Sequence, residues 1–185
     1  MAAINIVDSV KIQNDTNDLL QIDSITNSAY IIPVEHGYIH KGLGFFLSHS
    51  TIVDANNNYD ILLINPTNNN LHLMNHNATA AFSPGEFSIY EDAIINDNGS
   101  SLTIKNSNRL SSNIPNATIY ENPNINDIGY ELDCDFIIGS KVSGGITSEI
   151  SFEWILKQNS NYIFRYKNNS GIAADLNIKL FFLEV

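Results

Sequence analysis

Apolar and polar residues alternate along most of the chain with a period of two rather than 3.6. Four clear runs occur at residues 130–138, 150–157, 162–167 and 176–182. Such alternation is typical of a strand with one face in a core and the other in water. The residues predicted to point inward are Tyr130, Leu132, Cys134, Phe136, Ile138, Ile150, Phe152, Trp154, Leu156, Tyr162, Phe164, Tyr166, Leu176, Ile178, Leu180 and Phe182.

Turn-forming residues separate these runs. Asn96–Gly99 lies between residues 87–95 and 102–105 and predicts a β-hairpin. Asparagine-rich segments separate other runs at residues 56–58, 68–70 and 168–171, and a glycine-rich loop lies at 144–145. We interpret the asparagine-rich segments as turns, because asparagine tolerates the left-handed backbone angles that turns require. With roughly nine or ten strands, short connections, no sustained helical stripe and no repeat of fixed period, the pattern predicts an all-β, jelly-roll-like antiparallel β-sandwich.

The first 30 residues differ from the rest. A polar interruption, Asn14–Asp18, follows only a few apolar residues. We expect residues 1–30 to form an N-terminal arm and residues 31–185 to form the sandwich domain; an edge strand of that domain is the alternative for the arm. The N-terminal residues lack the basic stretch and long apolar run of a secretory signal or membrane span. We therefore expect synthesis and folding in a cytoplasm.

Charge narrows the choice of partners. The 185 residues include nine Lys and Arg against twenty Asp and Glu, a net charge of −11. The basic residues are scattered, so a phosphate backbone or an anionic membrane would be repelled. We expect neither nucleic acid nor membrane as a partner. A single cysteine, Cys134, excludes an intramolecular disulfide, so packing must hold the fold.

The histidines form two groups in the sequence. They are His36, His40 and His49, then His72 and His76. On a strand, residues four apart lie on one face about 13 Å apart, which is too far for one metal ion. A helix would bring His36 and His40 together, but Pro33 and Gly37 disfavour a helix there. We therefore predict no metal site and interpret these histidines as polar strand and loop residues.

Other polar patterns also fall short of a chemical site. Asp54, Asn56, Asn58 and Asp60 are spaced like calcium ligands, but Tyr59 replaces the required glycine and Asn65 the final glutamate. The acid pairs Glu91/Asp92 and Glu149/Glu153 are interpreted as solvated, since nothing isolates one carboxylate from water. No nucleophile elbow, phosphate-binding loop or zinc-protease motif is present. The prediction is therefore no catalytic residue, no cofactor and no enzymatic activity, with a small hydrolase on the same scaffold as an alternative.

Several segments resemble, in order, a family of auxiliary proteins on the heads of tailed bacteriophages. The clearest is Glu153–Arg165, and the resemblance extends over roughly residues 35–185. The other segments are His40–His49, Tyr59–Ile64, Ile89–Glu91, Asn106–Arg109, Ala117–Tyr120 ahead of Pro123, and Asp175–Phe182. The asparagine-rich composition suits a phage of an AT-rich host, such as the crAss-like group.

This resemblance implies a decoration or cement protein bound to the outside of an assembled head. Its partners would be the major capsid protein, further copies of itself (a homotrimer favoured) and head fibre proteins, and its location the capsid exterior of the virion. The family offers no catalytic residues to transfer. A receptor- or carbohydrate-binding module of a head fibre shares the fold class and is the alternative, because fold alone does not determine function.

Overall fold

The computed structural model describes residues 34–81, 83–138 and 153–185. Its contacts divide the chain into two units, Met1–His36 and Gly37–Val185. Several predictions fall outside the described residues: the arm at 1–30, the loop at 144–145, and the positions Ile150, Phe152 and Glu149. All of the described strands belong to the second unit.

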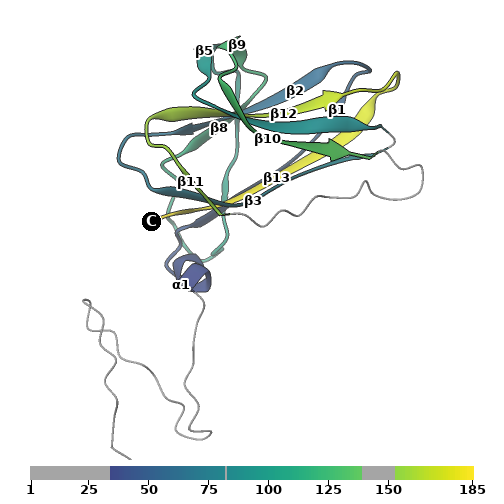
Figure 1. The fold of residues 1–185 in the computed structure, drawn as a ribbon. Helices are drawn as coiled ribbons and strands as arrows, with labels where there is room; N and C mark the ends of the chain where they lie inside the picture. The colour runs from purple at the N-terminus through teal and green to yellow at the C-terminus, as the bar shows by residue number, and fades with distance from the viewer. Residues whose placement is uncertain (1–33, 82, 139–152) are drawn as a thin grey trace, which may run out of the picture. The chain divides into compact units, whose positions relative to one another are not determined.

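Thirteen strands in the described residues form three antiparallel sheets (Figure 1). The five-stranded sheet contains, in order, β11 (Trp154–Leu156), β3 (Leu71–Ala81), β13 (Ala174–Glu184), β1 (Gly44–Val53) and β7 (Lys105–Asn106). The six-stranded sheet contains β10 (Tyr130–Ile137), β4 (Gly85–Glu91), β12 (Ser160–Asn168), β2 (Asn58–Asn65), β8 (Thr118–Glu121) and β6 (Ser100–Leu102). The third sheet pairs β5 (Ile94–Asp97) with β9 (Asn124–Asp127). The all-β prediction is confirmed, and the strands are more numerous than the nine or ten expected.

The two large sheets pack face to face around one hydrophobic core. Tyr162, Phe164 and Tyr166 of β12 are completely buried, and the inward residues of β13 are buried too. These two central strands follow the alternation seen in the sequence. Phe87 of β4 stacks on Phe164 with ring centroids 6.4 Å apart. Burial of large aromatic side chains of this kind contributes most of the core's stabilisation.

A second, smaller core lies on the outer side of the six-stranded sheet. Leu62 of β2 and Ile163 of β12 point away from the main core, yet both are completely buried. The small β5–β9 sheet covers this side, with Ile95 and Ile125 packed against the cluster. Figure 1 shows β5 and β9 together on the far side of the six-stranded sheet from β13. The third layer explains why β2 and β12 are apolar on both faces.

A repeated motif builds this third layer. Residues 89–100 (IYEDAIINDNGS) and 119–130 (IYENPNINDIGY) match at seven of twelve positions, so a short repeat is present that the sequence reading missed. The strand that follows each copy pairs with the start of the other copy: β10 with β4, and β6 with β8. The two copies therefore occupy equivalent places in the symmetrical order β10-β4-β12-β2-β8-β6.

The hairpin predicted at Asn96–Gly99 is wrong. The turn itself exists, with Gly99 at a φ of 83° and its amide bonded to Asp97 Oδ1 at 2.9 Å. However, β5 pairs with β9 and β6 with β8, not with each other. Because the motif is repeated, β5 and β6 each pair with a strand of the second copy instead of with each other. This pairing buries the apolar side chains of the second core, which favours it.

The face predicted to be inward on β10 is also wrong. The register places Asp133 opposite the buried Ile89, so the acidic side chain lies on the inner face. Phe136 is instead 75% exposed, and Cys134 is only half-buried. A β-bulge between Glu131 and Asp133 shifts the alternation by one residue. Because β10 is the last strand of its sheet, its inner face lies at the rim of the core.

A short helix, α1 (Val34–His40), forms where Pro33 and Gly37 were expected to prevent one. Proline directly before a helix costs little, because its missing N–H would have no partner in the first turn. Ile39 of α1 lies against Gly44, where a Cβ would come within 3.0 Å of the Ile39 side chain. In the described part of the chain, no helix has the length and apolarity needed to cross a bilayer.

Candidate functional site

Within the described ranges, the histidines and acids singled out in the sequence do not gather at one site. Among the described residues, no three His, Cys, Asp or Glu side chains are arranged to hold a metal ion. The calcium-like segment is a turn that leads into β2, with Asn56 at a φ of 58°. Asp60 instead forms a bidentate pair with Arg165 of β12, at 2.7 and 2.8 Å. The asparagine-turn prediction is confirmed at this position.

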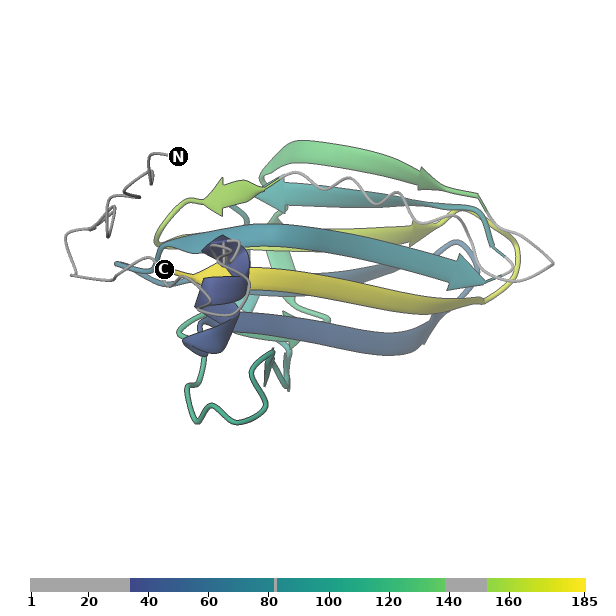
Figure 2. The same cartoon turned by 90° about the horizontal axis from the view of Figure 1, so that it is seen from below.

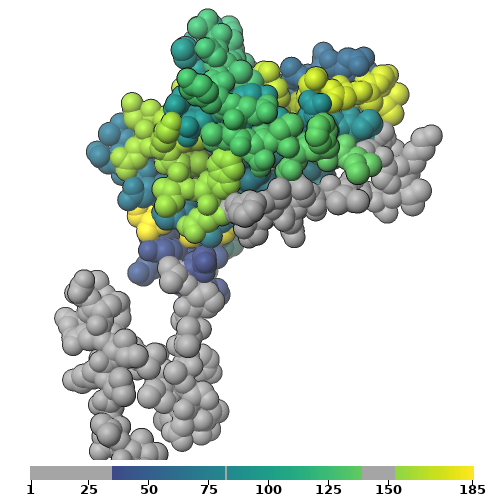
Figure 3. Space-filling view, in the orientation of Figure 1, coloured from purple at the N-terminus to yellow at the C-terminus, as the bar shows by residue number. Residues whose placement is uncertain are grey.

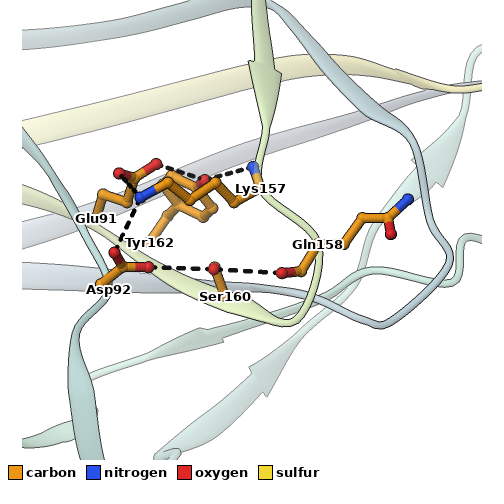
Figure 4. A network of polar contacts seen from close by, with 6 residues as sticks. All are labelled: Glu91, Asp92, Lys157, Gln158, Ser160 and Tyr162. Carbon is orange, nitrogen blue, oxygen red and sulfur yellow. Dashed lines mark hydrogen bonds and ion pairs between the residues drawn. The ribbon is translucent and has the colours of Figure 1, made fainter.

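Glu91 and Asp92 lie in a dense polar network (Figure 4). Lys157 Nζ is 2.6 Å from Glu91 Oε1 and 3.0 Å from Asp92 Oδ2. Tyr162 donates its hydroxyl to Glu91 at 2.8 Å and accepts the Lys157 amide at 2.7 Å. Ser160 donates to Asp92. Glu91 is thus paired and mostly buried rather than solvated, whereas Asp92 is paired and still exposed to water; both acids hold the turn between β11 and β12.

The corresponding glutamate of the second repeat is held in a similar way. Tyr59 donates to Glu121 Oε2 at 2.6 Å, and His49 Nε2 lies 3.3 Å from the same oxygen without hydrogen-bond geometry. The His49 ring stacks on Tyr59 at an interplanar angle of 7°. Burial, and then the hydrogen bonds to glutamate, raise the pKa of both Tyr59 and Tyr162. Both tyrosines therefore stay protonated and structural.

His76 of β3 is the most deeply buried of the described histidines, at 3% exposure. Its ring meets Trp154 edge-on at 6.1 Å, and Nε2 lies 3.8 Å from Asp133 Oδ2. Its Nδ1 has no hydrogen-bond partner. Burial lowers the pKa of His76 more than Asp133 and Asp135 raise it. This histidine is packed between aromatic rings, and it lines none of the three best-formed hollows of the described residues.

An asparagine-lined hollow of about 480 Å³ contains a buried carboxylate. Glu184 of β13 is 5% exposed, and no lysine, arginine or histidine of the described residues forms an ion pair with it. It accepts hydrogen bonds from the amides of Asn116 and Ala117, both at 2.8 Å, and from the side chains of Asn69 and Asn116. Because four N–H groups saturate this carboxylate, its role is to clamp the segment before β8 to the end of β13.

A shallow groove of about 540 Å³ lies on the outer face of the five-stranded sheet. Phe46 and Phe181 are cross-strand partners there and are half-buried. Asn75, Asn77 and Lys179 line the same groove. Two ring surfaces beside amide groups form a small mixed polar and apolar platform.

The segment between β7 and β8 carries the most exposed apolar side chains of the described chain. Leu110 is 98% and Ile114 is 84% exposed. Asparagine side chains hold the backbone beneath them: Asn108 bonds the carbonyl of His40, and Asn113 bonds those of Lys41 and Gly42. An apolar side chain on a fixed loop loses little further entropy on contact with a partner.

A second apolar surface follows β10 at the edge of the six-stranded sheet. Its exposed members are Tyr130, Leu132, Phe136 and Ile138. The green atoms of this part of the chain face the viewer in Figure 3. A group of exposed apolar residues along one strand is a better sign of a contact surface than scattered single ones. The sequence reading assigned these residues to the core and missed Leu110 and Ile114, whose serine- and asparagine-rich setting indicates only a loop.

Known proteins offer no identification. No family model matches the chain, and no curated protein matches it. Glu91, Asp92, Glu121 and Glu184 are engaged in structural contacts, and the most exposed apolar side chains of the described residues lie on the loop after β7 and along β10.

Proposed function

We propose that the chain is a structural protein of a virus particle, an auxiliary protein that binds the outside of a tailed-phage head and stabilises contacts between capsomers. One observation carries the proposal: apolar side chains as exposed as Leu110 and Ile114 sit on a loop held rigid by asparagine bonds. Folding gains nothing from this exposure. In a protein that binds a symmetrical particle, such preformed apolar side chains can contact the partner at every symmetry-related position.

The order of the strands supports a jelly roll within this proposal. With β6, β7, β8 and the β5–β9 pair set aside, one sheet has the order β11-β3-β13-β1 and the other β10-β4-β12-β2. Along the chain, β1 to β4 alternate between the two sheets, and so do β10 to β13, of which β11 is a short strand. Eight-stranded double sheets of this type occur in viral capsid proteins and in lectins. The β5–β9 layer is then an insertion between the fourth and fifth long strands.

The phage setting and the partners come from the sequence resemblance. Within that resemblance, Asn106–Arg109 begins the asparagine-held loop, and Glu153–Arg165 includes the turn fixed by the Lys157 network. The major capsid protein would be the partner, the capsid exterior the location, and association of several copies, favouring three, the working state.

The test is binding of the purified full chain to undecorated heads. Co-sedimentation should show saturable binding of wild-type protein, and Leu110→Ser/Ile114→Ser should reduce it at least tenfold. Ile52→Ser, at an exposed apolar position on β1, is the matched control and should bind normally. Absence of the chain from purified virions, together with no binding to heads, would overturn the proposal.

The groove at Phe46 and Phe181 favours one second candidate, a carbohydrate-binding module of a head fibre. Aromatic faces beside amides are suited to sugar rings, which present apolar faces and hydroxyl edges. A glycan array would show binding that Phe181→Ala abolishes and Leu110→Ser preserves. An array without any signal removes this candidate and leaves the first one untouched.

A further inference from the structure

Two exposed surfaces lie on opposite edges of the sandwich. β10 ends the six-stranded sheet and contacts β3 of the facing sheet, whereas β7 ends the five-stranded sheet beyond β1. Figure 2 shows the green strand β10 at one side and the teal loop that follows β7 at the other, past the blue strand β1. The two surfaces of one chain therefore cannot touch each other.

The acidic flank is the edge formed by β10. Its exposed apolar side chains are accompanied by Glu131 and by the partly exposed Asp133. No lysine or arginine occurs between Arg109 and Lys141 in the sequence, and the neighbouring cation Lys167 is paired with Glu86, the residue opposite Phe136. Within the described residues, β10 pairs only with β4, so its other edge has no strand partner.

The basic flank is the surface around the loop after β7. Leu110 and Ile114 are its apolar members, and Lys41, Lys105 and Arg109 are exposed around them. No aspartate or glutamate occurs between Asp97 and Glu121, nor between Glu35 and Asp54. On a chain of net charge −11, the exposed charged side chains here are positive, whereas the carboxylate of Glu184, which lines the same hollow as Ile114, is buried.

The two flanks are complementary in both properties. Each presents apolar side chains, and the exposed charges of the two flanks are opposite in sign on balance: Glu131, Asp133 and the Glu86–Lys167 pair on one, and Lys41, Lys105 and Arg109 on the other. An interface that joined two acidic flanks would place like charges together, which opposes association, whereas an acidic flank against a basic flank pairs opposite charges. Contact between different patches on identical chains is heterologous, and it closes into a ring when the rotation between copies permits.

We propose that the basic flank of one copy docks on the acidic flank of the next, so that identical chains associate head to tail. Leu110 and Ile114 then cover exposed apolar side chains of β10, Phe136 among them, and Arg109 faces the acidic side chains beside them. The contact also covers an edge strand, which would otherwise be open to unwanted pairing. The association is a property of the free chain. The inference rests on the proposed function only for the place of the oligomer on a phage head.

Sedimentation of the full chain over a range of concentrations tests the proposal. Wild-type protein should form oligomers, and Leu110→Asp and Phe136→Asp should each weaken association at least tenfold. Ile52→Asp introduces the same charge at another exposed apolar site and should have no effect. Circular dichroism checks that each variant folds; if Phe136→Asp does not fold, Glu131→Lys replaces it as the acidic-flank variant.

A mixing experiment separates this geometry from a symmetrical one. Leu110→Asp and Phe136→Asp each keep one intact flank, so an equimolar mixture should form a one-to-one dimer and nothing larger. A mixture that stays monomeric, or wild-type protein that stays monomeric at about 1 mM, overturns the inference. Head-to-tail oligomers that fail to bind heads would overturn the proposed function alone, and monomers that bind heads would overturn only the inference.

Discussion

Gly129 lies directly against the backbone carbonyl of Glu91, in a space that leaves no room for a side chain. Gly99 stands in the same relation to Glu121 in the other copy of the repeat. Both glycines have a φ near 84°, and each amide bonds an aspartate two residues earlier. The repeat thus places each turn glycine of one copy against the glutamate of the other, and these contacts hold the third layer on the sheet.

Gly129→Ala should strongly destabilise the fold. The left-handed backbone angle alone costs about 1–3 kcal/mol for a non-glycine residue, and the new Cβ would overlap the Glu91 carbonyl oxygen. Chemical denaturation should therefore show a loss of more than about 2 kcal/mol. Gly171→Ala is the control, because nothing lies within 4 Å of its Cβ position and its φ is ordinary. Equal losses in both variants would contradict this account.

The inward faces of the central strands were predicted correctly, because a paired strand on each side determines which face of a central strand points into the core. Tyr162, Phe164 and Tyr166 follow the alternation, since β12 has β4 on one side and β2 on the other. The asparagine turns predicted at residues 56–58 and 68–70 are confirmed by positive φ angles at Asn56 and Asn68, and Asn122 and Asn159 adopt the same backbone angles at positions that were not predicted. Because the left-handed backbone angle of a turn depends on the residue at that position, such a turn can be predicted from a few neighbouring residues.

The failures concern information that alternation does not contain. An alternation with period two does not show which face of a strand points inward. A single bulge between Glu131 and Asp133 reversed the inward face predicted for β10. The hairpin at Asn96–Gly99 failed because the partner of β5 lies thirty residues away in the second repeat. Exposure of Leu110 depends on asparagine bonds to α1 and to the residues that follow it, which no short window reveals.

Glu184→Ala should destabilise the end of the sandwich. It would leave the amides of Asn116 and Ala117 without their acceptor in a buried setting, at a cost of about 2–4 kcal/mol. Glu86, which pairs with exposed Lys167 at 3.5 Å, offers a matched control: Glu86→Ala should change the free energy of unfolding by less than about 1 kcal/mol. Similar losses in the two variants would show that the clamp at Glu184 is unimportant.

Trp154 is half-buried on the short edge strand β11, packed against the core rather than within it. The sequence predicted a core residue, for which loss to alanine costs roughly 3–5 kcal/mol. With part of the ring in water, we expect Trp154→Ala to cost about 2–3 kcal/mol in a denaturant titration. Ile155→Ala, on the exposed face of the same strand, should cost almost nothing. A loss for Ile155 as large as that for Trp154 would reverse the assigned faces.

Stability should fall as the solution is acidified, because of His76. Burial lowers its pKa in the folded chain below the usual 6.5, with Asp133 and Asp135 opposing the shift. Below that pH the unfolded state binds a proton that the folded state does not, so the free energy of unfolding rises with pH, by at most about 1.4 kcal/mol per unit for one group. The loss begins as pH falls through about 6.5 and ends once the folded state is protonated as well. Denaturation measured between about pH 7.5 and 5 should show this slope.

Two variants test that His76 is responsible for the slope. His76→Gln cannot titrate in this range, so its stability should change less with pH than that of the wild type. Asp133→Asn removes a carboxylate that favours the charged imidazole, so the loss of stability should extend to lower pH. If His76→Gln keeps the full slope, another group is responsible, and the neutral, packed histidine between Trp154 and Asp133 does not set the acid stability of the fold.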